Sequence, residues 1–221
     1  MKITDTVYGF IWRSTTANNC NTYLIDGPTR ILIDPGHSSL FDHVHKGLNE
    51  LGLTLDDIGL VIGTHAHPDH IEAAELFKEK PALATLHNKD WRFLKSMDNS
   101  PKTPLSLNTQ SIAPAFFLKE GDISISGFDF LVLHTPGHSP GSVSIYWPDQ
   151  KMLFTGDLVF KGGLGRTDLP GGNGAQLKES VKRLAELDVE WLLPGHGEII
   201  SGSEEIKANF EQVEQVWFNY L

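Results

Sequence analysis

Apolar positions along the chain alternate between short runs and a three-to-four-residue spacing, which are the patterns of strands and helices. The short runs, bounded by turn residues, predict strands at 21–26, 30–34, 60–64, 123–126, 128–134, 142–146, 152–155 and 191–193. Gly27-Pro28 separates the first two runs, so we expect a hairpin there. The wider spacing predicts helices at 41–51, 71–80, 177–187 and 203–221. Strands and helices that intersperse in this way indicate an α/β fold.

The predicted helices have apolar faces that we expect to pack on a core. These faces comprise Phe41, Val44, His45, Leu48 and Leu51; Leu177, Val181, Leu184 and Leu187; and Ile206, Phe210, Val213, Trp217 and Tyr220. Pro81 is expected to end the second helix, and Ser203, followed by two glutamates, to begin the last. We expect that last helix to pack on its own chain rather than to form a dimer face.

The domain organisation is predicted to be simple. The chain of 221 residues has 40% hydrophobic and 21% charged residues, which is ordinary for a globular protein. Residues 98–114 are rich in proline, serine, threonine and asparagine and predict a long surface connection rather than a boundary. We therefore expect one domain over 1–221, with the helix 203–221 packed on it.

Charge and cysteine content narrow the function classes. A formal net charge of -10 argues against nucleic acid and anionic membranes as partners, because both would repel the chain. Cys20 is the only cysteine, which excludes an intramolecular disulfide and favours a small packed residue. The sequence MKITDTVYGFIW has no long apolar run of a signal peptide. We expect a cytoplasmic monomer or homodimer that acts on a small molecule.

Candidate chemistry is concentrated directly after the apolar run 60–64. Three histidines and an aspartate follow within six residues, namely His65, His67, Asp69 and His70. Neutral imidazoles and carboxylates are natural ligands of zinc, iron and manganese. The absence of a cysteine ligand argues against a closed structural zinc site.

Three further candidates also follow predicted strands. His138 lies in Thr-Pro-Gly-His, Asp157 in Thr-Gly-Asp, and His196 in Pro-Gly-His-Gly. Strand ends that each deliver a histidine or an aspartate in a glycine-containing turn predict a metal site along one edge of the sheets.

In type and order, this set resembles the metallo-β-lactamase superfamily. The resemblance covers nearly the whole chain and includes Asp34 in Ile-Asp-Pro-Gly. It implies an αββα sandwich of two mixed sheets flanked by helices. The stretches Gly-Arg-Thr-Asp at 165–168 and Leu-Pro-Gly-Gly at 169–172 look most like the glyoxalase II-type thioesterase branch.

The resemblance also implies roles for these residues. One metal would be bound by His65, His67 and His138, the other by Asp69, His70 and His196, and Asp157 would bridge them. Zinc is the expected metal, with iron and manganese as alternatives. Two such cations would lower the pKa of a water, and the resulting hydroxide would attack an acyl carbonyl. Asp69 is expected to orient this hydroxide as the catalytic residue.

Other polar residues are not assigned as metal ligands. Asp34 is expected to hydrogen-bond a metal-site histidine. Lys161 and Arg166 fit either an anionic substrate group or structural ion pairs. The remaining histidines lack the pattern and are expected on the surface or in the core: His37, His43, His45, His87 and His134. Among them, His134 is the alternative candidate for the ligand position assigned to His138.

Several functions use the same residue types. Hydrolysis of a small acyl compound, with a hydroxyacyl-glutathione thioester favoured, is the leading hypothesis. Glyoxalase II itself has a larger C-terminal helical region, whereas only residues 197–221 follow His196 here. A persulfide dioxygenase would use one iron at His65, His138 and Asp157. Lactonases and phosphodiesterases are further alternatives, and the acidic charge disfavours a nuclease.

Overall fold

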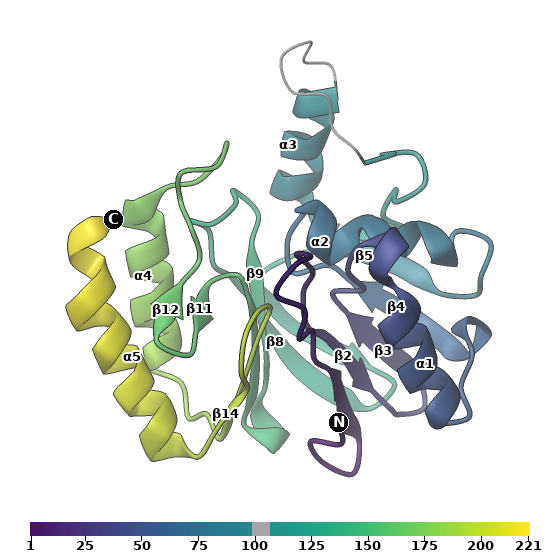
Figure 1. Cartoon of the computed structure of the whole chain (residues 1–221), viewed down its shortest axis with the longest axis horizontal. Coiled ribbons are helices and arrows are strands. Elements are labelled where there is room, and N and C mark those ends of the chain that lie inside the picture. Colours follow the sequence, from purple (N-terminus) through teal and green to yellow (C-terminus); the bar gives the residue numbers. More distant parts are fainter. Residues whose placement is uncertain (99–106) are drawn as a thin grey trace. The chain divides into compact units, whose positions relative to one another are not determined.

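The computed structural model describes residues 1–98 and 107–221. It has two compact units, Met1–Leu118 and Lys119–Leu221, each of which contains one six-stranded mixed sheet with helices (Figure 1). Two mixed sheets flanked by helices confirm the predicted fold class. The expectation of a single domain over 1–221 stays a prediction.

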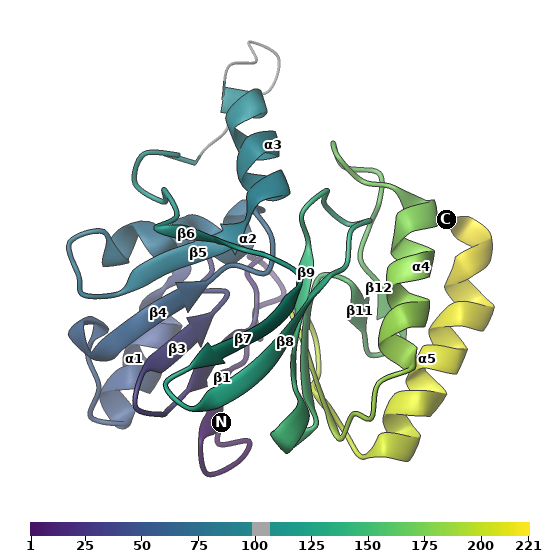
Figure 2. The same ribbon diagram turned by 180° about the vertical axis from the view of Figure 1, so that it is seen from behind.

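The sheet of the first unit has the order β1-β2-β3-β4-β5-β6, visible in Figure 2 for its last four strands. Its strands are β1 Val7–Phe10, β2 Thr22–Ile25, β3 Arg30–Ile33, β4 Ile58–Ile62, β5 Leu83–His87 and β6 Phe116–Leu118. The first three pair antiparallel, which confirms the hairpin around Gly27, and β3 to β6 pair parallel. The carboxyl ends of β3, β4 and β5 therefore lie at one edge of this sheet.

Short helices connect these strands. They are η1 Ser38–Leu40, α1 Asp42–Glu50, η2 Leu55–Asp57, α2 Pro68–Ile71, η3 Glu72–Phe77 and α3 Asn88–Asp98. Val44 and Leu48 of α1 are fully buried in a core that also contains Phe10, Leu32 and Phe77. In this unit the helices thus cover the sheet with the apolar faces that their spacing predicts.

The sheet of the second unit has the order β14-β13-β10-β9-β8-β7. Its strands are β7 Gly121–Ile125, β8 Phe128–His134, β9 Val143–Trp147, β10 Met152–Gly156, β13 Trp191–Pro194 and β14 Ile200–Ser201. Strands β8 and β10 each pair antiparallel with β9, and β13 pairs parallel with β10. Strands β8, β10 and β13 consequently run in one direction and end at the same edge.

Two long helices, α4 Gly174–Ala185 and α5 Ser203–Trp217, lie side by side in this unit (Figures 1 and 2). Their buried side chains pack with Leu153 and Leu192 of the sheet in one core. A small hairpin of β11 Val159–Phe160 and β12 Gly163–Leu164 follows β10. The 3-10 helix η4 Pro148–Gln150 precedes β10, and η5 Phe218–Tyr220 continues α5. Helix α5 thus packs on its own unit, while the expectation that it forms no dimer face stays a prediction.

Some expectations about helices were wrong. The segment 71–80 contains the last residue of α2 and the 3-10 helix η3 rather than a longer α-helix. His45, Leu51, Trp217 and Tyr220 are exposed. Leu51 and Tyr220 lie beyond the last residues of α1 and α5. Helix α5 does begin at Ser203, as expected, although its N-cap residue is Gly202, with φ at 97°.

The predicted connection 98–114 is only partly a surface segment. Residues 99–106 lie outside the described residues. Leu107 and Ile112 are buried in the core of the first unit, although they belong to no helix or strand. Two apolar side chains within a polar stretch therefore anchor this connection. Among the helices in the described part of the chain, none has the length and hydropathy of a membrane span.

We expect Leu48→Ala and Leu51→Ala to differ in their effect on stability. Leu48 is fully buried on α1, and its truncation should lower the free energy of unfolding by about 2–5 kcal/mol. Leu51 is 37% exposed, and its truncation should cost about 0.5 kcal/mol or less. Urea unfolding of both variants measures this difference. Equal losses would contradict the packing of α1 described here.

A carboxylate at the start of the second sheet should make stability depend on pH. The Arg183 guanidinium lowers the pKa of Glu120 from 4.5 to about 2. A lowered pKa stabilises the folded state above pH 4.5, and this contribution is lost as the pH falls through about 2. Because both side chains are more than 40% exposed, solvent screening limits the contribution to about 1 kcal/mol.

Glu120→Gln should therefore be less stable than the unchanged chain at neutral pH, and this difference should shrink as the pH falls toward about 2. Chemical denaturation at a series of pH values measures the difference. Glu211→Gln is the control, because Glu211 is exposed on α5 and has no ion pair among the described residues. A gap between Glu120→Gln and the unchanged chain that widens in acid would contradict the assignment.

Candidate metal centre

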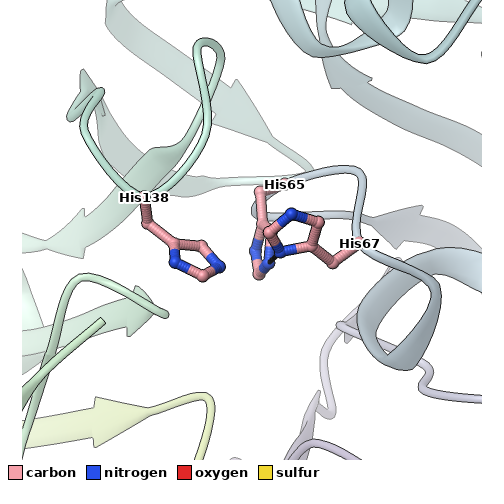
Figure 3. Close-up of side chains that lie close together, drawn as sticks. All are labelled: His65, His67 and His138. Carbon is pink, nitrogen blue, oxygen red and sulfur yellow. Dashed lines mark hydrogen bonds between the residues drawn. The ribbon is translucent and has the colours of Figure 1, made fainter. Parts of the chain in front are cut away.

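In the first unit, the loop after β4 and helix α2 hold four of the predicted ligands close together. Nε2 of His65 lies 3.0 Å from Nδ1 of His67, and Figure 3 shows these two side chains on their loop. The rings of His65 and His70 lie 4.1 Å apart, and ligand atoms of Asp69 and His70 lie within 4.8 Å of each other. His65 and His70 are almost fully buried.

Asp34, directly after β3, organises this group. Its Oδ2 lies 2.9 Å from Nδ1 of His70 and accepts from the hydroxyl of Thr64 at 2.7 Å, while its Oδ1 accepts from the amide of Thr64 at 2.7 Å. Asp34 is buried and has a φ of 52°, a conformation that aspartate tolerates better than most residues. The expected contact between Asp34 and a site histidine is confirmed.

These contacts determine which ring nitrogen of each histidine is protonated. A carboxylate only accepts hydrogen bonds, so Nδ1 of His70 carries the proton and Nε2 presents a lone pair. Thr64 donates its hydroxyl proton to Asp34 and thus accepts from Nδ1 of His65, which lies 3.2 Å from the hydroxyl oxygen. Both buried histidines therefore direct an unprotonated Nε2 away from their supports, as metal binding requires.

Two further side chains hold the same loop. Asp90, fully buried on α3, accepts from the amide of Ala66 at 2.8 Å, between His65 and His67. Asn18 donates to Oδ2 of Asp69 at 2.6 Å. Asp90 follows β5, so the three parallel strands β3, β4 and β5 all contribute at their carboxyl ends, where open α/β sheets bind ligands.

In the second unit, Asp157 lies between two histidines. Its Oδ2 is 3.5 Å from Nε2 of His138 and 3.4 Å from Nε2 of His196. The three residues follow β8, β10 and β13, whose ends share one edge of the sheet. The structure thus brings together all three ligands predicted for this half of the chain.

The loop after Asp157 fixes the orientation of His138, whose side chain is drawn in Figure 3. Nδ1 of His138 lies 2.8 Å from the carbonyl oxygen of Arg166 and must donate to it, which leaves Nε2 with a lone pair. A Cβ at Gly165 would lie 1.8 Å from the carbonyl oxygen of Asp157 and 3.2 Å from Nδ1 of His138. Only glycine fits at this position, next to two of the ligands.

Lys161 and Arg166 form ion pairs within this unit. Arg166 contacts both carboxylate oxygens of Asp168 at 2.7 and 2.6 Å and lowers the pKa of that carboxyl to about 2. Lys161 lies 2.9 Å from Glu198, which raises the pKa of the ammonium. Of the two roles that the sequence left open, the structure therefore favours structural ion pairs.

The other histidines have ordinary environments, as expected. His37 contacts Glu72 at 2.8 Å, and His43 contacts the carbonyl oxygen of Leu40, with its pKa lowered by burial. His134 contacts the carbonyl oxygen of Pro140 at 3.0 Å, while His45 is exposed and His87 is half-buried. Cys20 is fully buried, as the packing interpretation predicted.

The donor sets fit metal ions. A lone pair of His138 faces a carboxylate oxygen of Asp157 at 3.5 Å, and two electron-rich atoms at this distance are stabilised by a cation between or beside them. Each unit thus has imidazole and carboxylate donors, and His65, His70 and His138 present the unprotonated nitrogen that metal binding requires. Zinc, iron and manganese all accept such ligands.

Sequence reasoning missed several residues that orient the ligands. Thr64 and Gly165 are adjacent to recognised motifs, and their positions beside His65 and Arg166 were a usable signal. Asp90 and Asn18 had none, because each lies far along the chain from the residue that it contacts.

Comparison with known proteins agrees with this geometry. The sequence model of the metallo-β-lactamase superfamily matches residues 15–196, which include every predicted ligand. The chain belongs to the metallo-β-lactamase superfamily. The match covers more than four fifths of the chain, so the resemblance inferred from the motifs is confirmed.

Two relatives match this superfamily member over most of its length. A probable metallo-hydrolase of Methanocaldococcus jannaschii is 38% identical over 188 residues, which cover 81% of this chain and 88% of the relative. The hydroxyacylglutathione hydrolase GloC of Haemophilus influenzae is 32% identical over 197 residues, covering 86% and 91%. This chain is accordingly a metallo-hydrolase of the superfamily.

Solved structures share the fold. TTHA1623 in a di-iron-bound form has 32% identity and a TM-score of 0.68, with 96% of this chain and all of that chain covered. A metallo-β-lactamase family protein of Thermus thermophilus has 23% identity and a TM-score of 0.77, covering 97% and 80%. The second likeness supports the fold only.

We expect Asp34→Asn to weaken metal binding. Asparagine tolerates the positive φ of this position, but its amide nitrogen accepts no hydrogen bond, so a contact to Thr64 or His70 is lost. Loss of such an orienting partner should reduce metal affinity about 10- to 100-fold. Titration against a chelator measures the affinity, with Asp56→Asn on the exposed Lys80 pair as control. Unchanged affinity in Asp34→Asn would contradict the role assigned to Asp34.

Proposed function

We propose that this metallo-hydrolase binds two divalent metal ions and hydrolyses a small thioester of the hydroxyacyl-glutathione type. The observation that carries the proposal is the position of Asp157, whose Oδ2 lies within 3.5 Å of Nε2 in two histidines. A carboxylate shared by two imidazoles suits a bridge between two cations. Superfamily membership supports the same assignment.

The proposed ligand sets are those that the family resemblance implies. His65, His67 and His138 would hold one metal, Asp69, His70 and His196 would hold the other, and Asp157 would be shared by both. When bound, the metals would lower the pKa of a water and polarise the acyl carbonyl. Asp34, Thr64 and the carbonyl of Arg166 keep the histidine rings in the tautomer that binds metal.

Asp69 is the proposed proton-handling residue. It lies at the start of α2, and Asn18 donates to its Oδ2 at 2.6 Å. This hydrogen bond orients the carboxylate. The oriented carboxylate would direct the attacking oxygen or receive its proton.

The substrate class is supported by the relative GloC, whose name records hydrolysis of hydroxyacylglutathione. The match covers 86% of this chain and 91% of that relative, so the likeness extends over most of both chains. An anionic small-molecule substrate, a cytoplasmic location and a monomeric or homodimeric state belong to the same proposal. Zinc remains the expected metal, and the di-iron form of TTHA1623 makes iron the alternative to test first.

Asp157→Ala tests the proposal. We expect the unchanged chain to contain about two metals and to hydrolyse a hydroxyacyl-glutathione thioester. Asp157→Ala should lose both metals and the activity, because the variant removes the shared carboxylate. Elemental analysis and the decrease in thioester absorbance measure these effects. Asp149→Ala, which removes an exposed carboxylate of the same unit, is the control.

Other outcomes would point elsewhere. Two metals and full activity in Asp157→Ala would refute the bridge. One iron per chain, with oxygen consumption on glutathione persulfide, would replace the hydrolase by a persulfide dioxygenase. Two metals with turnover of a lactone or a phosphodiester, but not of thioesters, would keep the metal site and change the substrate.

A further inference from the structure

We infer that Asn209 and Trp217 of α5 are positioning residues for the metal ligands of the second unit. They act through the hairpin of β11 and β12, which connects Asp157 to the backbone group that holds His138. The inference rests on the proposed function in one respect, namely the assignment of His138, Asp157 and His196 as ligands.

The contacts between α5 and the hairpin are hydrogen bonds from side chains to backbone. The amide of Gly162 donates to Oδ1 of Asn209 at 2.7 Å, and Nδ2 of Asn209 donates to the carbonyl oxygen of Phe160 at 3.0 Å. Nε1 of Trp217 donates to the carbonyl oxygen of Gly162 at 2.8 Å. Asn209 is 5% exposed, so one buried amide connects both sides of the turn.

The hairpin needs such support because it is very short. Each strand has two residues, and the turn between them includes Gly162 with a φ of 70°. Isolated two-stranded hairpins are marginally stable even when they are longer. Within the unit, α5 contacts β12, and the hydrogen bonds from Asn209 and Trp217 fix the turn on the helix.

From the hairpin, short connections lead to all three ligands. The amide of Gly165 donates to the carbonyl oxygen of Leu158, which closes the hairpin one residue after Asp157. The next residue, Arg166, accepts from Nδ1 of His138 at 2.8 Å. The ring of Phe160 lies edge-on to His196, with centroids 5.9 Å apart.

A displacement of this hairpin would therefore move more than one ligand. Gly165 has no free space toward Asp157 or His138, since a Cβ there would overlap the carbonyl oxygen of Asp157. Close packing transmits a shift of the loop directly to these two residues. Asn209 and Trp217 thus stabilise the geometry of a site that neither of them touches.

The test compares three variants of the full chain. Asn209→Leu removes both hydrogen bonds at nearly constant volume, and Trp217→Phe removes one bond at an exposed position, where folding is not at risk. Val213→Ala is the control, because Val213 is fully buried on α5 between these residues and its side chain has no hydrogen bond to break. Each variant is titrated with zinc and with ferrous iron against a chelator.

We expect Asn209→Leu to bind metal about tenfold more weakly, which is the smallest loss usual for residues that orient metal ligands. Trp217→Phe should lose less metal affinity than Asn209→Leu. Val213→Ala should keep the affinity of the unchanged chain even if its stability falls. Hydrogen exchange of the Gly162 amide, measured without metal, should accelerate in Asn209→Leu and not in Val213→Ala.

Two results would overturn the inference. One is an Asn209→Leu variant that binds metal as tightly as Val213→Ala. The other is an equal loss of affinity in both variants, which would show a general effect of α5 packing. Asp157→Ala separates this failure from that of the proposed function, because retention of metal in that variant refutes the ligand assignment whatever Asn209→Leu does.

Discussion

A histidine binds a metal through an unprotonated ring nitrogen, so the other nitrogen must keep its proton on a fixed acceptor. Much of the local structure satisfies this requirement. Asp34 accepts from His70, Thr64 accepts from His65, and the carbonyl of Arg166 accepts from His138. Because each acceptor is itself held in place, the tautomers and directions of these rings are set before any metal binds.

The two units meet the requirement by different means. In the first unit a buried carboxylate acts through side chains, and Asp34 needs a φ of 52° to reach Thr64 and His70 together. In the second unit a backbone carbonyl acts, and Gly165 lets that strand of chain pass within contact of Asp157 and His138. Substitutions should therefore affect the first group through charge and hydrogen bonding, and the second through steric displacement.

The candidate ligands could be predicted from the sequence because each follows an apolar strand closely. The position of such a strand is visible in its own residues, which is a local property. Asp90, Asn18 and Asn209 could not be found in this way, since each contacts a segment more than 20 residues distant. Nothing in the spacing around an asparagine indicates that its amide will meet a distant hairpin.

Errors in the helices have a related cause. The face predicted for 41–51 assumed a helix that continues to Leu51, whereas α1 ends at Glu50 and leaves Leu51 exposed. In α5 the same assumption placed Trp217 on the core face, although its indole nitrogen donates to Gly162 and its ring is 41% exposed. An indole ring can pack against an apolar neighbour while its N–H donates to a polar one. The helical spacing of apolar residues predicts only the apolar contact. The aromatic end of α5 thus contacts the hairpin of β11 and β12 as well as the core. Polar atoms of α5 hydrogen-bond the hairpin beside the candidate site, and its apolar atoms pack in the core.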